Sequence, residues 1–148
     1  MSTNLDSIRD ATPFADIDNA CFQHLQVDGV REQLSADSFD AGWGGIVDEL
    51  LRIRTLTDDW DGEGSVVPDA MLVDCALKIA TGFKQVHLRS ADRVHAGVNG
   101  TVFFEWHLAD GYQEVEVFNG CRAELRWLAN GANESEISEL ALDETTQP

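Results

Sequence analysis

The chain has 148 residues, of which 27 are Asp or Glu and 10 are Lys or Arg, so its formal net charge at pH 7 is −17. This length fits one domain, and a hydrophobic content of 43% is enough for a core. The negative charge argues against direct binding to nucleic-acid phosphates or to anionic lipid. No stretch reaches the ~18 apolar residues that a membrane-spanning helix needs, and we find no secretory leader.

The acidic side chains concentrate toward the two ends of the chain. Residues 1–64 carry 14 acidic and 4 basic side chains, and residues 129–148 carry 5 acidic and no basic ones, whereas residues 65–128 are nearly balanced. A surface with this charge attracts basic partners, although solubility alone could also explain the charge.

The cysteines Cys21, Cys75 and Cys121 are far apart in the sequence and form no CxxC pair. This pattern predicts reduced thiols in a cytoplasmic protein, with Cys75 and Cys121 as small core residues.

Helical periodicity dominates the first half of the chain. Phe14, Ile17, Cys21 and Leu25 recur at helical spacing, which predicts a helix over about 14–26, and a short helix near 29–35 could follow. We therefore expect residues 1–40 to form a helical N-terminal region. The glycine-rich run at 42–45 is predicted to interrupt the chain before a helix over about 46–56. The clearest pattern predicts a helix over 69–86, with Asp69 as its N-cap.

After residue 90 the period of the hydrophobic pattern changes to two. Segments 94–98, 101–108, 112–118 and 121–128 alternate in hydrophobicity, and tight turns separate them, with a type I′ turn expected at Asn99-Gly100. The predicted fold class is α+β, with N-terminal helices packed on a three- to four-stranded antiparallel β-meander within residues 41–128. Residues 129–148 are predicted to form an acidic, flexible tail, with at most one or two helical turns over 135–142.

Cross-strand charges are also predicted for this sheet. If segments 112–118 and 121–128 pair about the Asn119-Gly120 turn, Glu114 and Glu116 come close to Arg122 and Arg126.

A distinctive motif links the two most clearly predicted helices. It reads Asp59-Trp60-Asp61-Gly62-Glu63-Gly64-Ser65, and Pro68 follows it. A structural interpretation places Trp60 in the core, Asp61 in an Asx turn, and glycines where positive φ is needed. A functional interpretation makes the loop an acidic site for a cation or a basic partner. The candidate binding residues are Asp58, Asp59, Trp60, Asp61 and Glu63.

A calcium-binding EF-hand loop does not fit this motif. With Gly62 at the glycine position of such a loop, its first and last ligand positions fall on Thr57 and Pro68, neither of which is an acid.

The same motif resembles a family of small, uncharacterised bacterial proteins. Their pattern is W-D-G-x-G-[AS]-x-x-P, then a helix, then a hairpin with G-x-x-x-E-W, and the resemblance covers about residues 46–120. It assigns a structural role to Gly62, Gly64, Pro68, Glu105 and Trp106. Prolines usually precede the hairpin glycine in the family, whereas this chain has Arg93-Val94-His95-Ala96 there. The resemblance implies an interaction role as an accessory protein of mobile-element or defence-type gene clusters.

Enzymatic motifs are not apparent in this sequence. The histidines His24, His87, His95 and His107 lack HxH or HExxH spacing, and the chain has no G-x-S-x-G motif and no P-loop. His95 and His107 could still meet across the predicted Asn99-Gly100 hairpin. We predict no catalytic residues, metal ligands or cofactor.

Three functional hypotheses follow. The first is an acidic, non-enzymatic protein-binding module, such as an accessory, antitoxin or immunity-type inhibitor of a basic partner. The second is a nucleic-acid mimic that inhibits a DNA- or RNA-binding protein, and the third is an enzyme with a carboxylate or divalent-metal site around Asp61. A homodimer that pairs through an exposed final strand also stays open.

Overall fold

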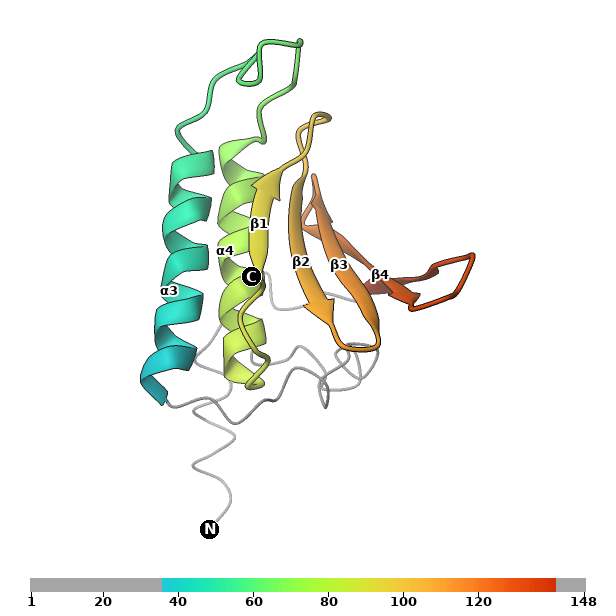
Figure 1. The fold of residues 1–148 in the computed structure, drawn as a ribbon. Coiled ribbons are helices and arrows are strands. Elements are labelled where there is room, and N and C mark those ends of the chain that lie inside the picture. The colour runs from blue at the N-terminus through green and yellow to red at the C-terminus, as the bar shows by residue number, and fades with distance from the viewer. Residues whose placement is uncertain (1–35, 141–148) are drawn as a thin grey trace.

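The computed structural model describes residues 36–140, which form two helices followed by a five-stranded antiparallel sheet (Figure 1). The helices lie side by side on one face of the sheet, so the predicted α+β class is confirmed, with one strand more than expected. Neither helix in this range is long and apolar enough to cross a membrane. The elements in chain order are α3 (Ala36–Ile53), α4 (Ala70–Gln85), β1 (Arg93–Ala96), β2 (Val102–Leu108), β3 (Gly111–Phe118), β4 (Arg122–Ala129) and β5 (Glu136–Leu140).

Helix α4 agrees with its prediction, whereas α3 does not. The Asp69 carboxylate caps α4 by accepting the backbone N–H of Met71. Helix α3 passes straight through the glycine-rich run at 42–45, so the predicted interruption there is wrong. The reason is tertiary, because Trp43 is only 2% exposed and its indole N–H donates to the Leu88 carbonyl at 2.9 Å. This packing outweighs the cost of about 1 kcal/mol that each glycine adds to a helix.

The glycines of α3 give a direct test of this balance. An added Cβ at Gly44 or Gly45 would meet nothing within 4 Å, whereas at Gly42 it would overlap the side chain of Ser90. Gly44→Ala and Gly45→Ala are therefore each expected to raise the free energy of unfolding by about 0.5–1 kcal/mol. Gly42→Ala is expected to lower it. Urea unfolding followed by circular dichroism measures all three, and a loss of stability in Gly44→Ala would contradict this account.

The inner face of the sheet and the two helices enclose the core. Phe83 of α4 lies edge-on to Phe104 and Trp106 of β2, with ring centroids 5.7 and 5.6 Å apart. Val115 and Val117 of β3 are fully buried beside them. This agrees with the alternation predicted for these strands, in which every second residue faces the helices.

The turns differ from the predicted ones, and the differences change the register. At the β1–β2 turn, positive φ occurs at Gly100 but not at Asn99, so the expected type I′ turn is replaced by a three-residue loop over 98–100. The β3–β4 turn also has three loop residues, 119–121. As a result Glu114 lies opposite Arg126, as expected, but Glu116 lies opposite Glu124 rather than beside Arg122.

The acidic segment after β4 is partly ordered as a strand. Residues 136–140, expected in a flexible tail with a helical turn, instead form β5 and pair with β4. Gly131, with φ of 80°, lies in the connection that returns the chain to the edge of β4. Leu140 then enters the core with 3% exposure. The prediction missed β5 because its strand character depends on backbone pairing and not on an apolar alternation.

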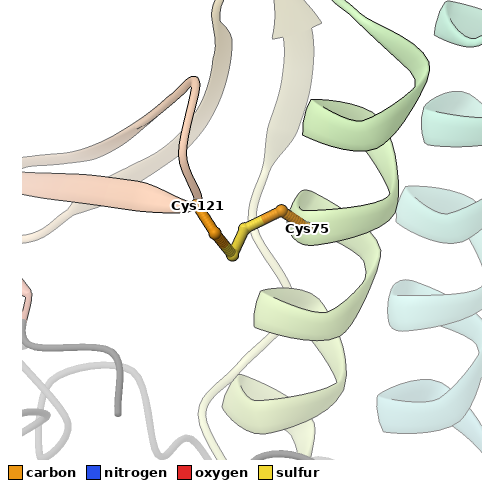
Figure 2. Close-up of a disulfide and its surroundings, with 2 residues drawn as sticks. All are labelled: Cys75 and Cys121. Carbon is orange, nitrogen blue, oxygen red and sulfur yellow. A yellow bond between two sulfur atoms is a disulfide. The ribbon is translucent and has the colours of Figure 1, made fainter. Parts of the chain in front are cut away.

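A disulfide joins the helical layer to the sheet. Cys75 of α4 and Cys121 of the β3–β4 turn are bonded, with their Cα atoms 5.6 Å apart (Figure 2). The prediction of reduced thiols is therefore wrong for this pair, which lies 46 residues apart in sequence and could not be recognised by spacing. Cys21 lies outside the described residues, as do the helices expected over 14–26 and 29–35.

Candidate functional site

The loop between the helices is held together by its own carboxylates. Asp58 accepts the backbone N–H of Val67, and Asp59 accepts that of Gly64. Asp61 accepts the backbone N–H groups of Glu63 at 2.9 Å and Ser65 at 3.3 Å, which confirms the predicted Asx turn. Hydrogen bonds from Ser65 and Glu63 hold the pKa of Asp61 below its usual range. The loop also has positive φ at Asp59, Gly62 and Gly64.

This loop is anchored to the β1–β2 turn at the end of the molecule where α3 ends (Figure 1). The Val66 N–H donates to the Val98 carbonyl at 2.9 Å, and an added Cβ at Gly100 would lie 3.2 Å from Val66. Pro68 is buried, whereas Trp60, predicted to lie in the core, is only half-buried and packs against the edge of the core. The structural interpretation of the motif therefore accounts for its acids and glycines, with Glu63 left exposed at the loop surface.

A metal site around Asp61 gains no support from this geometry. Across residues 36–140, no three His, Cys, Asp or Glu side chains come together in a group that could hold a metal ion. The acids of the loop instead receive backbone donors.

Two substitutions at Asp61 test the role of this carboxylate. Asp61→Ala removes the acceptor of two backbone N–H groups and is expected to lower the free energy of unfolding measurably. Asp61→Asn keeps an acceptor oxygen at the same place and is expected to lower the free energy of unfolding less than Asp61→Ala does. Chemical denaturation of both variants measures the difference. Equal losses for the alanine and asparagine variants would show that the charge, and not the hydrogen bonding, matters.

A second group of acids converges on the face of the sheet that points away from the helices. We call it the acidic face. The register places Glu105 opposite Glu114, Glu116 opposite Glu124, and Glu124 opposite Glu139. Opposed residues of an antiparallel pair lie about 4.5–5.5 Å apart, so the acids of this face form a continuous cluster on strands rather than on loops. Its members are Glu105, Glu114, Glu116, Glu124 and Glu139.

In one half of the acidic face the carboxylates accept hydrogen bonds from nearby side chains. The Glu105 side chain is only 13% exposed and lies 2.9 Å from the His95 Nε2 atom. Burial alone would raise the pKa of Glu105, but hydrogen bonds from His95 and Tyr112 outweigh it and hold the pKa below the usual value. Glu114 is 12% exposed and accepts hydrogen bonds from Arg126 and from the Tyr112 hydroxyl, each at 2.7 Å. Burial and the contact with Glu114 raise the pKa of Tyr112, so its hydroxyl stays protonated.

The other half of the face is only partly compensated, because Arg122 Nε lies 3.7 Å from Glu139 Oε1 whereas no ion pair within residues 36–140 involves Glu116 or Glu124. Glu116 and Glu124 are directly opposed, and like charges in that arrangement destabilise a sheet. Burial raises the pKa of the Glu116 carboxyl above its usual value, and the charges of Glu114 and Glu124 raise it further. Thr101 and Arg126 act in the opposite direction without cancelling the shift. The folded chain thus holds negative charge in a place where it is electrostatically unfavourable.

Aromatic rings border the acidic face. Phe103 lies in the same cross-strand row as Glu116 and stacks on the ring of His95, with centroids 5.1 Å apart. The guanidinium of Arg122 lies 5.9 Å from the centre of the Phe118 ring. His95 and His107 do not meet across the hairpin, because His95 is opposite Phe103 and His107 is opposite Tyr112.

Only part of this arrangement is predictable from the sequence. Glu105 and Trp106 were assigned one structural role, but neighbouring residues of a strand point to opposite faces, so Trp106 is buried and Glu105 belongs to the acidic face. Glu114 and Glu116 carried little information in so acidic a chain. The alternation of β2, β3 and β4, combined with the correct loop lengths, could have placed every member of the cluster except Glu139, which lies on the unpredicted strand β5.

Comparison of the chain with protein-family models, curated proteins and solved structures finds no match. The resemblance to the bacterial family with the W-D-G motif therefore stays a prediction.

Proposed function

We propose that this chain is a small, acidic protein-binding module that holds a basic partner protein on its acidic face. The observation that carries the proposal is the direct opposition of Glu116 with Glu124 on the adjacent strands β3 and β4. This pair destabilises the free fold by up to about 1 kcal/mol. A cationic partner would turn this repulsion into attraction, so the arrangement is costly alone and favourable in a complex.

The same face suggests the chemistry of the partner. Lysine and arginine side chains would pair with the carboxylates, and arginine could also stack on the half-buried rings of Phe103 and Phe118. The net charge of −17 would steer such a partner toward the chain and make association fast and salt-dependent. An accessory, antitoxin or immunity-type inhibitor in a mobile-element or defence-type locus is a role that fits this binding mode.

The experiment compares three tagged baits in extracts of the native host at low and high salt. The first is the parent chain and the second is Glu116→Gln/Glu124→Gln. The third, Glu63→Gln/Glu134→Gln, removes the same two charges from exposed sites outside the acidic face. We expect the parent and the third bait to retain one basic protein that survives nuclease treatment, and the second bait to lose it. With the purified partner, calorimetry should show at least a ~tenfold weaker Kd for the second bait. Equal binding by all three baits would overturn the proposal.

Competition with nucleic acid distinguishes the mimic hypothesis. If the captured protein binds DNA or RNA, and the parent chain displaces that nucleic acid in an equilibrium assay, the acidic face substitutes for phosphates. If binding is unaffected by a saturating duplex, the partner is held at a site of its own.

A stability measurement tests the stored repulsion without any partner. Because the folded-state pKa of Glu116 is raised, its favourable contribution is fully present below the unfolded-state pKa of about 4.5 and is lost as the pH rises through the folded-state value. Glu116→Gln should therefore stabilise the protein at pH 7, by about 0.5 kcal/mol, and less at pH 4. Urea unfolding at both pH values measures this, with Glu63→Gln as the control. A destabilised Glu116→Gln protein at pH 7 would count against stored repulsion.

The disulfide affects the proposed cellular compartment of the protein. The cytoplasmic assignment depended on reduced cysteines, and the Cys75–Cys121 bond removes that support. Disulfides persist in oxidising compartments and are rare in the cytoplasm, where they are usually transient or redox-sensing. We therefore propose an oxidising site of action for the chain. Acid-quenched alkylation of host cells followed by mass spectrometry should find this pair unalkylated, whereas two alkylated thiols would return the protein to the reducing cytoplasm.

A further inference from the structure

An open groove runs between α3 and the segment Ser90–Ala96, which contains β1. Its volume is about 810 Å³, and it is lined by both apolar and polar side chains. The apolar part includes Ile46 on α3 and Leu56 and Trp60 beyond the end of that helix. At one end the two walls touch, since an added Cβ at Gly42 would overlap Ser90, whereas at Gly45 it would meet nothing within 4 Å. The walls therefore diverge from Gly42 toward the loop.

One wall of this groove is a sheet edge that has no partner strand within residues 36–140. The strand order is β1-β2-β3-β4-β5, so β1 is paired only with β2 and its other side faces the groove. Edge strands expose unpaired backbone groups, and native proteins commonly cover them with a helix or a loop. Within the described residues, α3 lies beside this edge without filling the space above it.

We propose that residues 14–26 of the same chain dock in this groove as a helix antiparallel to α3. These residues lie outside the described range, and Phe14, Ile17, Cys21 and Leu25 give them one apolar face that needs a partner. A helix of this length measures about 20 Å, and the groove follows α3 from Ala41 to Arg52 over about 17 Å. The two lengths match.

The connection and the charges favour the same placement. Residues 27–35 join this segment to the start of α3, and helix–helix connections commonly need only about 2–8 residues. The antiparallel orientation brings Asp16 and Asp18 to the end of the groove that contains Arg52. It also sets the dipoles of the two helices in opposition, as in an αα-hairpin.

The test uses a cysteine that the chain already has. Cys75 and Cys121 are bonded to each other, so Cys21, on the apolar face of the docking segment, is the remaining cysteine of the three. Gly45→Cys places a thiol in the groove, and Gly44→Cys places one on the neighbouring position of α3, which does not line it. Both sites have space for a side chain, and both variants should unfold at denaturant concentrations no lower than the parent.

Mild oxidation of the two full-length variants, followed by tryptic mapping, measures how much of Cys21 becomes bonded to the introduced thiol in each. Cleavage after Arg31 puts Cys21 and the introduced thiol on separate peptides. The introduced thiols are separated from Cys21 by nearly the same number of residues, so in an undocked segment Cys21 would react with both equally. We expect the intramolecular bond to form at least ~tenfold more in Gly45→Cys than in Gly44→Cys.

The other outcomes overturn the proposal. Equal intramolecular yields in the two variants would mean that residues 14–26 do not occupy the groove, and failure of both bonds would mean the same. Disulfide-linked dimers of the Gly45→Cys variant would assign the groove to a second copy of the chain. This inference does not depend on the acidic face, so the two proposals can fail separately.

Discussion

Removal of the Cys75–Cys121 disulfide is expected to lower the free energy of unfolding by about 4 kcal/mol. The bond closes a loop across 46 residues, and in the chain-entropy model such a link restricts the unfolded chain by about that amount. It also holds the β3–β4 turn against α4, because one cysteine comes from each. A loss of this size is a large part of the roughly 5–15 kcal/mol that keeps a typical domain folded.

The double variant Cys75→Ala/Cys121→Ala, studied by urea unfolding, measures this loss. The parent protein in excess reductant should show a similar decrease, which separates the bond from the effect of the substitutions. Cys21→Ser serves as the control, since it removes a cysteine that is not part of the bond. If the variant and the oxidised parent unfold at the same urea concentration, the disulfide does not support the fold.

Replacement of Trp106 by alanine should destabilise the protein by about 4–5 kcal/mol. This side chain has no exposed surface and packs against Phe83 and Phe104. Its indole N–H also donates to the Arg89 carbonyl at 2.9 Å, and the truncation leaves that carbonyl without its donor.

Trp60→Ala is the matched comparison for this core variant. Trp60 is half-buried at the edge of the core and should cost about 1–2 kcal/mol, because less of its apolar surface is removed from water. Trp106→Phe separates packing from hydrogen bonding by keeping an aromatic ring without the donor. Denaturant unfolding of the three variants gives the order, and a Trp60→Ala loss equal to that of Trp106→Ala would contradict the assignment of the core.

Local patterns predicted those parts of the fold whose burial repeats regularly in sequence. The apolar spacing through Phe83 predicted α4 within one residue at each end, and the alternation around Phe104 and Val115 predicted the central strands. The prediction that glycines 42–45 interrupt α3 is wrong because the helix propensity of glycine is a local property. The contact that stabilises this part of α3, between Trp43 and the Leu88 carbonyl, joins residues far apart in sequence. Strand β5 was not predicted because it is defined by its backbone pairing with β4, and such pairing has little effect on amino-acid composition.

The candidate site shows the same division. The turn chemistry of Asp61 was evident from residue types, since an acid two residues before a free backbone N–H commonly forms an Asx turn. The acidic face was not evident, because the opposition of Glu116 with Glu124 depends on a three-residue loop that replaced the expected two-residue turn. A change of one residue in loop length decides which charges face each other across a pair of strands.

Two consecutive carbonyls in the α4–β1 connection receive indole donors from different layers. Trp43 on α3 donates to Leu88, and Trp106 on β2 donates to Arg89. Separation of either layer breaks one of these hydrogen bonds, each of which contributes about 0.5–1.5 kcal/mol, together with the packing of the tryptophan that donates it. The connection therefore couples the opening of the helices to the opening of the sheet, so that neither can detach alone at low cost. Amides of α3 and of β2 should consequently exchange with solvent at similar free energies, as parts of one cooperative unit.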